Sequence, residues 1–410
     1  MLTTLAIANY RSLRELIVPL GALNVVTGPN GSGKSNLYRA LRLLALTARG
    51  GVIPSLAREG GLQSTLWAGP ERFSRAVLAG EQPVQGTVRK DAVSLRLGFA
   101  GDAFGYAIDL GLPLPSVTSQ FTLDPVIKRE CIWSGPFLRP SALLVDRQGP
   151  SIRIRHTGDK GSDRAGDRAN DKAGGRASDG GDWTTLAQPV ASFDSMMTEY
   201  ADPRAAPEMI AVREQIRSWR FYDHFRTDQH ASARQVQIGT HSPVLADDGA
   251  NLAAALQTIR EIGDAEALDH AIGDAFPGAR VEIVNHEGRF EVALRQEGLL
   301  RPLRGAELSD GTLRYLLLAA ALLSPRPPGL LVLDEPETSL HPDLLPSLAR
   351  LIARASAHSQ VIVVSHAARL VAALEREASS QSIVLERRLG ATGFADPDSL
   401  EVPAWKWPAR

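Results

Sequence analysis

The sequence predicts an α/β protein: a parallel core sheet flanked by helices, a β-rich first lobe, and an inserted α/β lobe. Three observations lead to this fold class. A short apolar strand near the N-terminus runs through a glycine-rich loop into a helix, residues 84–156 alternate as strands do, and continuous apolar strands alternate with helices after residue 306. We therefore expect the chain to begin and end in one α/β unit, with the middle inserted into it.

The bulk composition is that of a globular protein with several lobes. The chain has 410 residues, of which 44% are hydrophobic and 22% charged, and its formal net charge is -1. That balance provides no whole-chain attraction for nucleic acid. Cys131 is the single cysteine, which excludes a disulfide framework within the chain. No apolar run reaches the roughly 20 residues of a bilayer span, so we expect a cytoplasmic protein without membrane contact.

The first predicted segment covers residues 1–156. "TLAIANY" and "SLRELIVPL" read as strands joined by a turn, and "LNVVTG" is a third strand entering the glycine-rich loop. A helix is predicted over 34–49, because Leu37, Leu41 and Leu44 fall on one face. The alternating stretches 84–110 and 121–156 then predict an antiparallel β-rich region.

Residues 157–182 contain a near-repeat of Asp-Arg-Ala with almost no large apolar side chains. Such a composition cannot bury enough surface to offset its ordering entropy, which predicts a disordered insert. A basic nucleic-acid-binding arm is the alternative, but the acidic and basic residues nearly cancel. Residues 183–280 are predicted to form a helical inserted lobe, with helices over 205–226 and 249–276.

The last predicted segment, residues 281–410, returns to the core sheet. "ARVEIVNHEGRFEVAL" is predicted to be a hairpin that turns at Asn-His-Glu-Gly. A helix after residue 306 is followed by the strand "GLLVLDEP", a helix over 343–357, the strand "QVIVVSH" and a helix over 367–378. This alternation predicts a parallel sheet covered on both faces.

The stretch from Gly28 to Ser35, "GPNGSGKS", matches G-x-x-x-x-G-K-[ST] between a strand and a helix. Glycines in such a loop let backbone amides point at phosphates, Lys34 can reach the β- and γ-phosphates, and Ser35 can bind Mg²⁺. The alternative is a glycine-rich turn with a chance lysine. The position after a strand and before a helix favours a phosphate-binding loop.

Two further strand ends carry candidate catalytic groups. "LLVLDEPETSLHP" presents Asp334, suited to the Mg²⁺ shell, and Glu335, suited to polarising an attacking water. "QVIVVSH" ends at His366, which we expect to contact a γ-phosphate at the same sheet edge. In isolation, an Asp-Glu pair is usually a solvated strand end and a lone histidine is usually structural.

"LSDGT" at 308–312 opens an apolar helical run. Ser309 fits an N-cap and Gly311 lies in the first turn, which is consistent with a capped, buried helix. A helix N-terminus is also suited to an anion, because its amides are unpaired and its dipole end is positive.

Together these motifs resemble the Walker A, signature, Walker B with D-loop, and switch-histidine motifs of ABC-type ATPases. The chain most resembles the RecF/SMC-like branch of stand-alone bacterial ATPases, related to the ATPase part of OLD-family proteins. "ANYRSL", "WRFYDHF" and "DDGANLAAAL" also resemble that branch, so the likeness covers most of the chain outside 157–182.

The resemblance implies ATP and Mg²⁺ as cofactors and a homodimer on ATP binding. Ser309 and Gly311 would face the γ-phosphate of ATP held by Lys34 of a second copy. It also implies that Arg11 contacts nucleotide and that Gln63 contacts Mg²⁺, although Gln63 lacks the usual preceding strand. The implied Walker A contacts with the nucleotide are those of Asn30, Gly31, Ser32, Gly33, Lys34, Ser35 and Asn36.

Two departures from the wider family narrow the function. Some 300 residues separate Lys34 from Asp334, far more than in transporter cassettes, which disfavours a transporter subunit. No heptad pattern is sustained, so no long coiled coil is expected between the two halves.

Three functions remain open. The first is an ATP-driven dimerisation switch, with nucleic acid as the client implied by the resemblance, in repair or phage defence. The second is a nuclease: the 44 residues after His366 are too few for an OLD-type nuclease domain, which leaves a separately encoded nuclease or toxin as an effector partner. The third is a non-hydrolysing sensor, which would not need Glu335.

Overall fold

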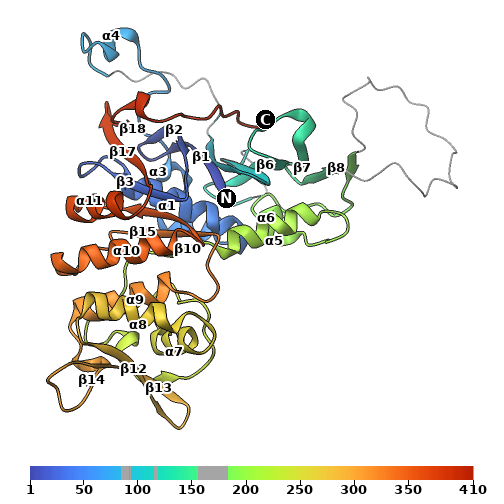
Figure 1. Ribbon diagram of the computed structural model, residues 1–410. Helices are drawn as coiled ribbons and strands as arrows, with labels where there is room; N and C mark the ends of the chain where they lie inside the picture. The colour runs from blue at the N-terminus through green and yellow to red at the C-terminus, as the bar shows by residue number, and fades with distance from the viewer. Residues whose placement is uncertain (85–91, 93, 115–118, 156–182, 410) are drawn as a thin grey trace, which may run out of the picture. The chain divides into compact units, whose positions relative to one another are not determined.

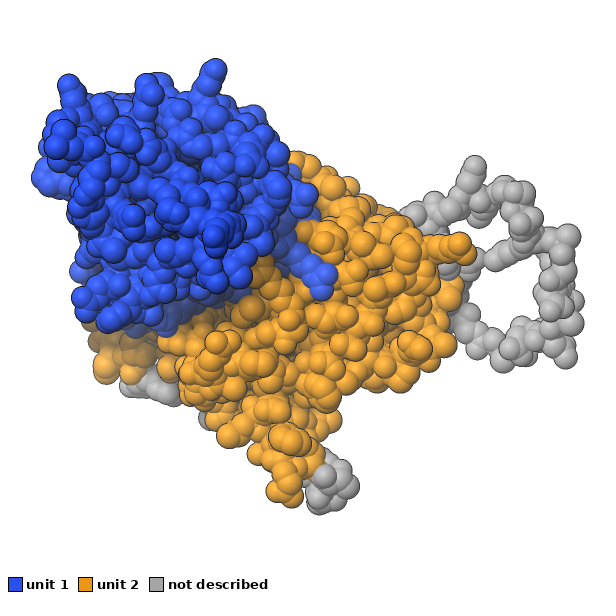
Figure 2. All heavy atoms as spheres, turned by 90° about the horizontal axis from the view of Figure 1, so that it is seen from below, with its two compact units in different colours: residues 1–2, 19–42, 215–401 blue, residues 3–18, 43–214, 402–410 orange. Residues whose placement is uncertain are grey.

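The computed structural model describes residues 1–84, 92, 94–114, 119–155 and 183–409. The insert predicted over 157–182 lies outside the described residues. The described chain divides into two compact units (Figure 2): unit 1 comprises residues 1–2, 19–42 and 215–401, and unit 2 comprises residues 3–18, 43–214 and 402–410. These units cut the chain at other positions than the four predicted segments, so that four-part division stays a prediction.

Unit 1 is built on a six-stranded sheet with the strand order β10-β15-β16-β3-β17-β18. The first five strands are parallel, and β18 is antiparallel to β17. The strands of this sheet are β3 (Leu23–Thr27), β10 (Arg220–Tyr222), β15 (Leu330–Asp334), β16 (Gln360–Val364), β17 (Gln381–Arg388) and β18 (Ala391–Phe394).

The central strands are apolar because both faces of the sheet are covered. All five residues of β16 and the first four of β3 and β15 are buried. The helices of this unit are α1 (Lys34–Leu46, which begins here), α7 (Leu252–Ile262), α8 (Ala265–Ala275), α9 (Asp310–Leu322), α10 (Leu345–Ala355) and α11 (Ala368–Glu377). The α/β fold with a parallel core sheet is confirmed.

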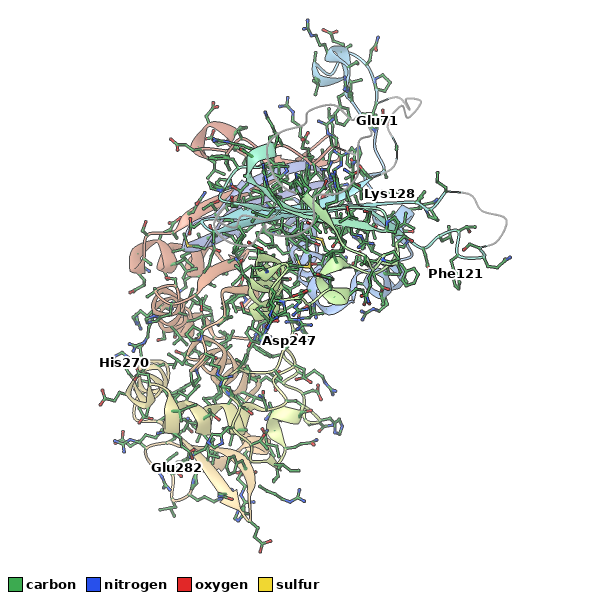
Figure 3. The ribbon with its side chains drawn as sticks, turned by 90° about the vertical axis from the view of Figure 1, so that its right-hand side faces the viewer. Glu71, Phe121, Lys128, Asp247, His270 and Glu282 are labelled. Atoms are coloured by element: carbon green, nitrogen blue, oxygen red, sulfur yellow. The ribbon has the colours of Figure 1, made fainter. Side chains whose placement is uncertain are left out.

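A smaller antiparallel sheet belongs to the same unit. The predicted hairpin is confirmed as β12 (Arg280–His286) paired with β13 (Arg289–Arg295); β13 also pairs with β11 (Gln237–Ile238) and β14 (Leu303–Arg304). Helix α8, which carries His270, packs on β12, which carries Glu282 (Figure 3). Buried side chains of α7 to α10 join both sheets in one apolar cluster.

Unit 2 confirms the β-rich region, which is antiparallel from β4 to β9. Its sheet has the order β2-β1-β4-β5-β6-β7-β8-β9. Figure 1 labels β1, β2, β6, β7 and β8 of this sheet. The strands are β1 (Leu2–Tyr10), β2 (Leu13–Pro19), β4 (Leu95–Gly101), β5 (Phe104–Gly111), β6 (Val126–Ser134), β7 (Leu143–Gln148), β8 (Ser151–Arg155) and β9 (Trp183–Thr185). The helices are α2 (Val52–Arg58), α3 (Leu62–Thr65), α4 (Arg75–Leu78), α5 (Met196–Glu199) and α6 (Pro207–Ser218), whose last four residues are assigned to unit 1.

Two predicted helices need correction. The helix expected over 205–226 ends at Ser218, and Arg220–Tyr222 forms β10 instead. The aromatic side chains of Phe221 and Tyr222 are buried and favour a strand, which pairs in parallel with β15. The helix expected over 249–276 is split into α7 and α8, because Gly263 ends the first and Asp264 caps the second through the Ala267 amide at 2.8 Å.

The prediction of no long coiled coil is consistent with the helices, since the longest in the described residues, α1 and α9, have 13 residues each. None of the described helices combines the length and apolar character needed to span a bilayer.

Candidate nucleotide site

Four parallel strands bring the predicted motifs of unit 1 to one edge of the core sheet. Because the carboxyl ends of parallel strands meet at the same edge, the segments after β3, β10, β15 and β16 are neighbours. Leu333 pairs with Tyr222 and with Val363, and Asp334 pairs with Val364, which is in turn opposite Val26. The phosphate loop, the Asp334-Glu335 pair and Ser365-His366 therefore start from adjacent strand ends.

The loop between β3 and α1 has the backbone conformation that its glycines permit. Gly28, Gly31 and Gly33 have φ angles of 142°, 78° and 108°, which side chains with a Cβ rarely adopt. The ammonium of the buried Lys34 donates hydrogen bonds to the carbonyl oxygens of Gly28 at 2.7 Å and Pro29 at 3.2 Å. The lysine thus already lies over the loop that it would share with a phosphate.

The other predicted residues of the loop differ in their exposure to solvent. Asn30 and Ser35 are exposed and Asn36 is partly buried at the start of α1. The hydroxyl of Ser32 is buried without a hydrogen-bond partner in the described residues, which is consistent with a loop shaped for an added polar group.

The hairpin of β17 and β18 supports this loop, and the sequence analysis did not predict it. The hydroxyl of Thr392 donates to the carbonyl of Ser32 at 2.7 Å. A Cβ at Gly33 would lie 2.1 Å from the Thr392 hydroxyl, and a Cβ at Gly28 would lie 2.2 Å from the carbonyl oxygen of Leu385. Glycine is therefore required twice in the loop for close approach to this hairpin as well as for backbone conformation.

Asp334 ends β15 as a partly buried carboxyl. Its burial, followed by the charges of Glu335, Asp223 and Glu337, raises its pKa to about 6 from an ordinary value of 3.8. A group of negative charges that raises the cost of ionisation is suited to a cation, because a divalent ion relieves both the repulsion and the desolvation.

This electrostatic penalty predicts the pH response of an Asp334→Asn variant. In the folded protein the carboxyl keeps its proton up to about pH 6, so its contribution to stability falls as pH rises from the unfolded value through about 6. Without nucleotide or Mg²⁺, Asp334→Asn should melt at a higher temperature than wild type at about pH 7.5 and at a similar temperature near pH 4. Thermal melts at both pH values, with the exposed Asp124→Asn as control, measure this; equal melting temperatures at the higher pH would contradict it.

Glu335 follows Asp334 in a left-handed conformation, with φ 48°. Its amide donates to the carbonyl of Val364 at 2.8 Å, and its exposed carboxylate lies 3.4 Å from Nδ1 of His366. This strained conformation directs the chain away from β15, while the hydrogen bond of the Glu335 amide keeps residue 335 next to β16. The two predicted catalytic side chains, Glu335 and His366, are in contact.

A second glutamate, which the sequence analysis did not select, joins the same two strands. Glu337 is 8% exposed, and its Oε1 accepts hydrogen bonds from the Ser365 hydroxyl at 2.7 Å and from the amides of His366 and Ala367 at 3.1 and 3.3 Å. The spacing Glu335-x-Glu337 was visible in "DEPE", but sequence alone did not distinguish it from a surface pair.

The signature segment forms the N-terminus of α9. Ser309 is the N-cap, and its hydroxyl accepts from the Thr312 amide at 3.1 Å. Ser309 and Asp310 are exposed. A Cβ at Gly311 would lie 2.9 Å from the carbonyl oxygen of Ser339, which follows the Asp334-Glu335 turn. The loop is therefore packed against the Walker B segment of its own chain and is open to solvent on its outer side.

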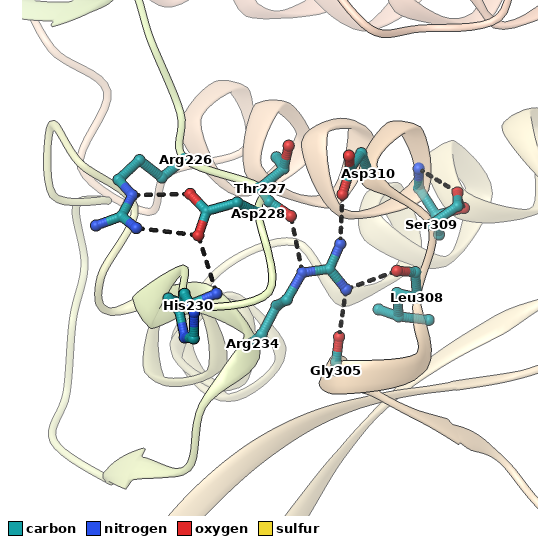
Figure 4. A network of polar contacts seen from close by, with 10 residues as sticks. Arg226, Thr227, Asp228, His230, Arg234, Gly305, Leu308, Ser309 and Asp310 are labelled. Atoms are coloured by element: carbon teal, nitrogen blue, oxygen red, sulfur yellow. Dashed lines mark hydrogen bonds and ion pairs between the residues drawn. The ribbon is translucent and has the colours of Figure 1, made fainter.

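Arg234 fixes this loop from beneath (Figure 4). The guanidinium is buried and donates to the carbonyl oxygens of Thr227, Gly305 and Leu308 at 2.8, 2.9 and 2.6 Å. It also pairs with the carboxylate of Asp310 at 2.7 Å. The pair draws the negative charge of Asp310 toward a cation, which leaves the positive end of the α9 dipole less opposed.

Arg314 links α9 to Glu335. It is 4% exposed, and its Nη2 donates to the Glu335 carbonyl oxygen at 3.0 Å. Burial lowers its pKa, whereas the charges of Glu337, Glu335 and Asp223 oppose that change. The helix behind the signature loop is thus tied to the turn that carries the predicted catalytic carboxylate.

The two remaining predicted residues lie in unit 2. Arg11 pairs with Glu59 at 2.6 Å, and Gln63 is exposed in α3; their roles toward nucleotide and Mg²⁺ stay predictions.

Within unit 1, Asp223 follows β10 directly beside the strand that carries Asp334. Its carboxylate accepts from Arg42 at 2.7 Å. The short strand β10 could have been found from its aromatic side chains, which would have placed Asp223 at this edge.

A glycine loop at the N-terminus of α1, with carboxylates and a histidine at adjacent strand ends, defines a P-loop ATPase of the ABC type. The family model described as "AAA domain, putative AbiEii toxin, Type IV TA system" matches residues 23–165 and 200–372, and the chain belongs to this family. The predicted RecF/SMC-like relationship is confirmed. Membership implies nucleotide binding and, typically, Mg²⁺.

One curated relative is the OLD nuclease of Thermus scotoductus (strain ATCC 700910 / SA-01), 43% identical over 56 residues. That match spans 14% of this chain and 10% of the relative, so the chain covers only a small part of the length of that protein.

Two solved structures are similar over most of the chain. One is the SmcHead bound to the C-winged helix domain of ScpA, with 14% identity, TM-score 0.48, and coverage of 96% of this chain and 97% of that one. The other is the SMC head domain from Thermotoga maritima, with 15% identity, TM-score 0.44, and coverage of 96% and 98%.

Proposed function

We propose that this protein binds ATP with Mg²⁺, hydrolyses it, and uses the two nucleotide states to join and separate two copies of the chain. The observation that carries the proposal is the meeting of Lys34, Asp334, Glu335 and His366 on adjacent strand ends, with Glu335 and His366 3.4 Å apart. Nucleotide binding alone does not need a carboxylate suited to activating water, which disfavours a non-hydrolysing sensor.

Each group has a role in this proposal. Lys34 and the loop amides bind the phosphates, and the Ser35 hydroxyl and the Asp334 carboxylate hold Mg²⁺, which would neutralise phosphate charge. Glu335 polarises the attacking water, and His366 contacts the γ-phosphate. The donor set of one hydroxyl and one carboxylate of raised pKa fits the oxygen ligands that Mg²⁺ takes. Asp223 is a further candidate ligand of Mg²⁺, in addition to the predicted Gln63.

The exposed N-terminus of α9 supports dimerisation. Ser309 and Gly311 would complete the nucleotide site of a second copy, where the helix dipole favours a phosphate. Hydrolysis would remove that contact, so the two states would differ in dimer affinity.

We propose a DNA-related role, in repair or phage defence, on the basis of the family and the OLD relative. The net charge of -1 requires any nucleic-acid contact to be local. An effector encoded separately, a nuclease or toxin controlled by this ATPase, is the second candidate, because the family description names a toxin and the OLD relative is a nuclease. The single cysteine, Cys131, is a buried free thiol, consistent with the predicted cytoplasmic location.

Phosphate release by the purified protein tests the first part. Wild type should release phosphate from ATP with Mg²⁺ and not with EDTA, and duplex DNA should raise the rate if nucleic acid is the client. Lys34→Ala should bind ATP ~10-fold or more weakly, because it loses the ammonium that pairs with phosphate. Wild-type affinity of the Lys34→Ala variant for a fluorescent ATP analogue would show that this loop does not bind the nucleotide.

A further inference from the structure

The buried carboxylate of Glu337 connects the turn after β15 to the loop after β16. The two carboxylate oxygens of Glu337 differ in their hydrogen bonding. Oε1 accepts three hydrogen bonds from the switch loop, from the Ser365 hydroxyl and the amides of His366 and Ala367. Oε2 is buried with no hydrogen-bond partner in the described residues. A carboxylate buried with one oxygen unpaired is costly to the fold, which sets Glu337 apart from an ordinary solvent-exposed glutamate.

The imidazole of His366 lies beside the same Glu337 oxygen that accepts the hydrogen bonds of the switch loop. Its Nδ1 lies 3.4 Å from Oε1 of Glu335 and 3.5 Å from Oε1 of Glu337. Two carboxylates on one side of the ring favour a proton on Nδ1, which leaves Nε2 as the nitrogen available on the other side. The ring is 53% exposed while the Glu337 side chain is 7% exposed, so the fixed group is the glutamate and the orientable group is the histidine.

The peptide at His366 is held by the same carboxylate as its ring. The Ser365 hydroxyl that donates to Glu337 also accepts from the Ala367 amide at 3.1 Å. This arrangement pairs the amides of His366 and Ala367, which immediately precede α11, and so holds the loop before this helix. The three hydrogen bonds that Glu337 accepts from the Ser365 hydroxyl and the two amides hold the loop. Its fourth contact, with Nδ1, orients the imidazole of His366.

We propose that Glu337 is a positioning residue for ATP hydrolysis, which acts through His366 by holding the switch loop and directing Nδ1 toward the carboxylates. The inference rests on the proposed hydrolytic function and deepens it. Glu337 does not touch nucleotide in this proposal. It determines where Nε2 of His366 lies relative to Glu335 when ATP is in the site.

A double-mutant cycle in kcat tests the proposal. Glu337→Gln keeps a side-chain oxygen for the loop but loses the charge facing Nδ1. It should reduce kcat by about tenfold or more and leave KM and the affinity for ATP within about threefold. In a His366→Ala background the same change should cost less than about threefold, because the residue through which it acts is gone. Single-turnover assays with enzyme in excess make the slow variants measurable.

Further variants separate positioning from folding. Glu337→Ala should be slower than Glu337→Gln, because it loses the loop contacts as well. Ser365→Ala, which removes one donor only, should lower kcat in the same direction by a smaller factor. Glu377→Gln on the exposed face of α11 is the matched control and should keep wild-type kcat. Thermal melts with and without ATP are recorded for each variant.

The outcomes distinguish this inference from the proposed function. If the losses from Glu337→Gln and His366→Ala are additive, or if Glu337→Gln raises KM at unchanged kcat, Glu337 does not act through His366 and the inference is wrong while the ATPase stands. If wild type releases no phosphate while Lys34-dependent ATP binding is normal, the hydrolytic function fails and this inference fails with it.

Discussion

A Glu335→Gln protein should bind ATP as tightly as wild type and hydrolyse it ~10²-fold or more slowly. The glutamine keeps the size of the side chain and the backbone hydrogen bonds of residue 335. These include the bond that its amide donates to the Val364 carbonyl and the bond that its own carbonyl accepts from Arg314. It removes only the charge that would polarise water. Loss of turnover without loss of affinity is the pattern of an interaction made in the transition state.

The same substitution should trap the ATP-bound dimer. With hydrolysis slowed, light scattering at saturating ATP should report a dimer that persists for longer than that of wild type, because the contacts to the γ-phosphate remain. Phosphate release and scattering are measured on the same samples. Turnover equal to that of wild type would show that Glu335 has no role in hydrolysis. Normal ATP affinity without a dimer would contradict the proposed dimerisation switch but not the proposed role of Glu335 in hydrolysis.

A Glu335→Ala variant controls for the geometry of this turn. Residue 335 has φ 48°, a conformation that a side chain with a Cβ adopts at some cost. Alanine and glutamine share that cost with glutamate, so a similar loss of turnover in both variants identifies the carboxylate as the cause. A melting temperature near that of wild type in both would show that the turn has kept its shape.

The sequence was sufficient where chemistry and secondary structure coincide in a few adjacent residues. The loop from Gly28 to Ser35 has a motif between an apolar strand and a helix, and both were found at their predicted places. Asp334 ends one mostly apolar strand and His366 comes two residues after another, so their position at one sheet edge follows from the parallel pairing. These are local patterns whose physical cause lies within about ten residues.

What could not be predicted depends on partners distant in the sequence. Thr392 supports the loop at Ser32 from 360 residues away, and nothing in "GATGF" indicates this. Most hydrogen bonds of Glu337 and Arg234 are made with backbone atoms of other segments, which carry no signature in the residue type. The aromatic side chains of the three-residue strand β10 were a weak signal within a helical pattern, because its strand character depends mainly on the pairing with β15.

The proposed role of Ser309 in the site of a second copy predicts a recovery of activity when two inactive variants are mixed. If each site combines Lys34 of one copy with Ser309 of the other, neither Lys34→Ala nor Ser309→Arg homodimers contain an intact site. A mixed dimer regains one, with Lys34 from the Ser309→Arg chain and Ser309 from the Lys34→Ala chain. Random exchange makes about half of the dimers mixed with one of two sites intact, so an equimolar mixture should reach roughly a quarter of the wild-type ATPase rate.

We expect Ser309→Arg to disturb the signature loop without unfolding the protein. Ser309 is exposed and its hydroxyl caps α9 by accepting from the Thr312 amide, so the substitution costs about 1 kcal/mol of capping without filling a core position. Ser309→Ala, which removes the capping hydroxyl without adding a charged side chain, controls for the lost cap. A signature loop that acts only within its own chain cannot be rescued by mixing, and full activity of Ser309→Arg alone would exclude Ser309 from the site. Dimerisation of the mixture with ATP is followed by light scattering, so mixed dimers that form without activity would show that one intact site is insufficient for turnover.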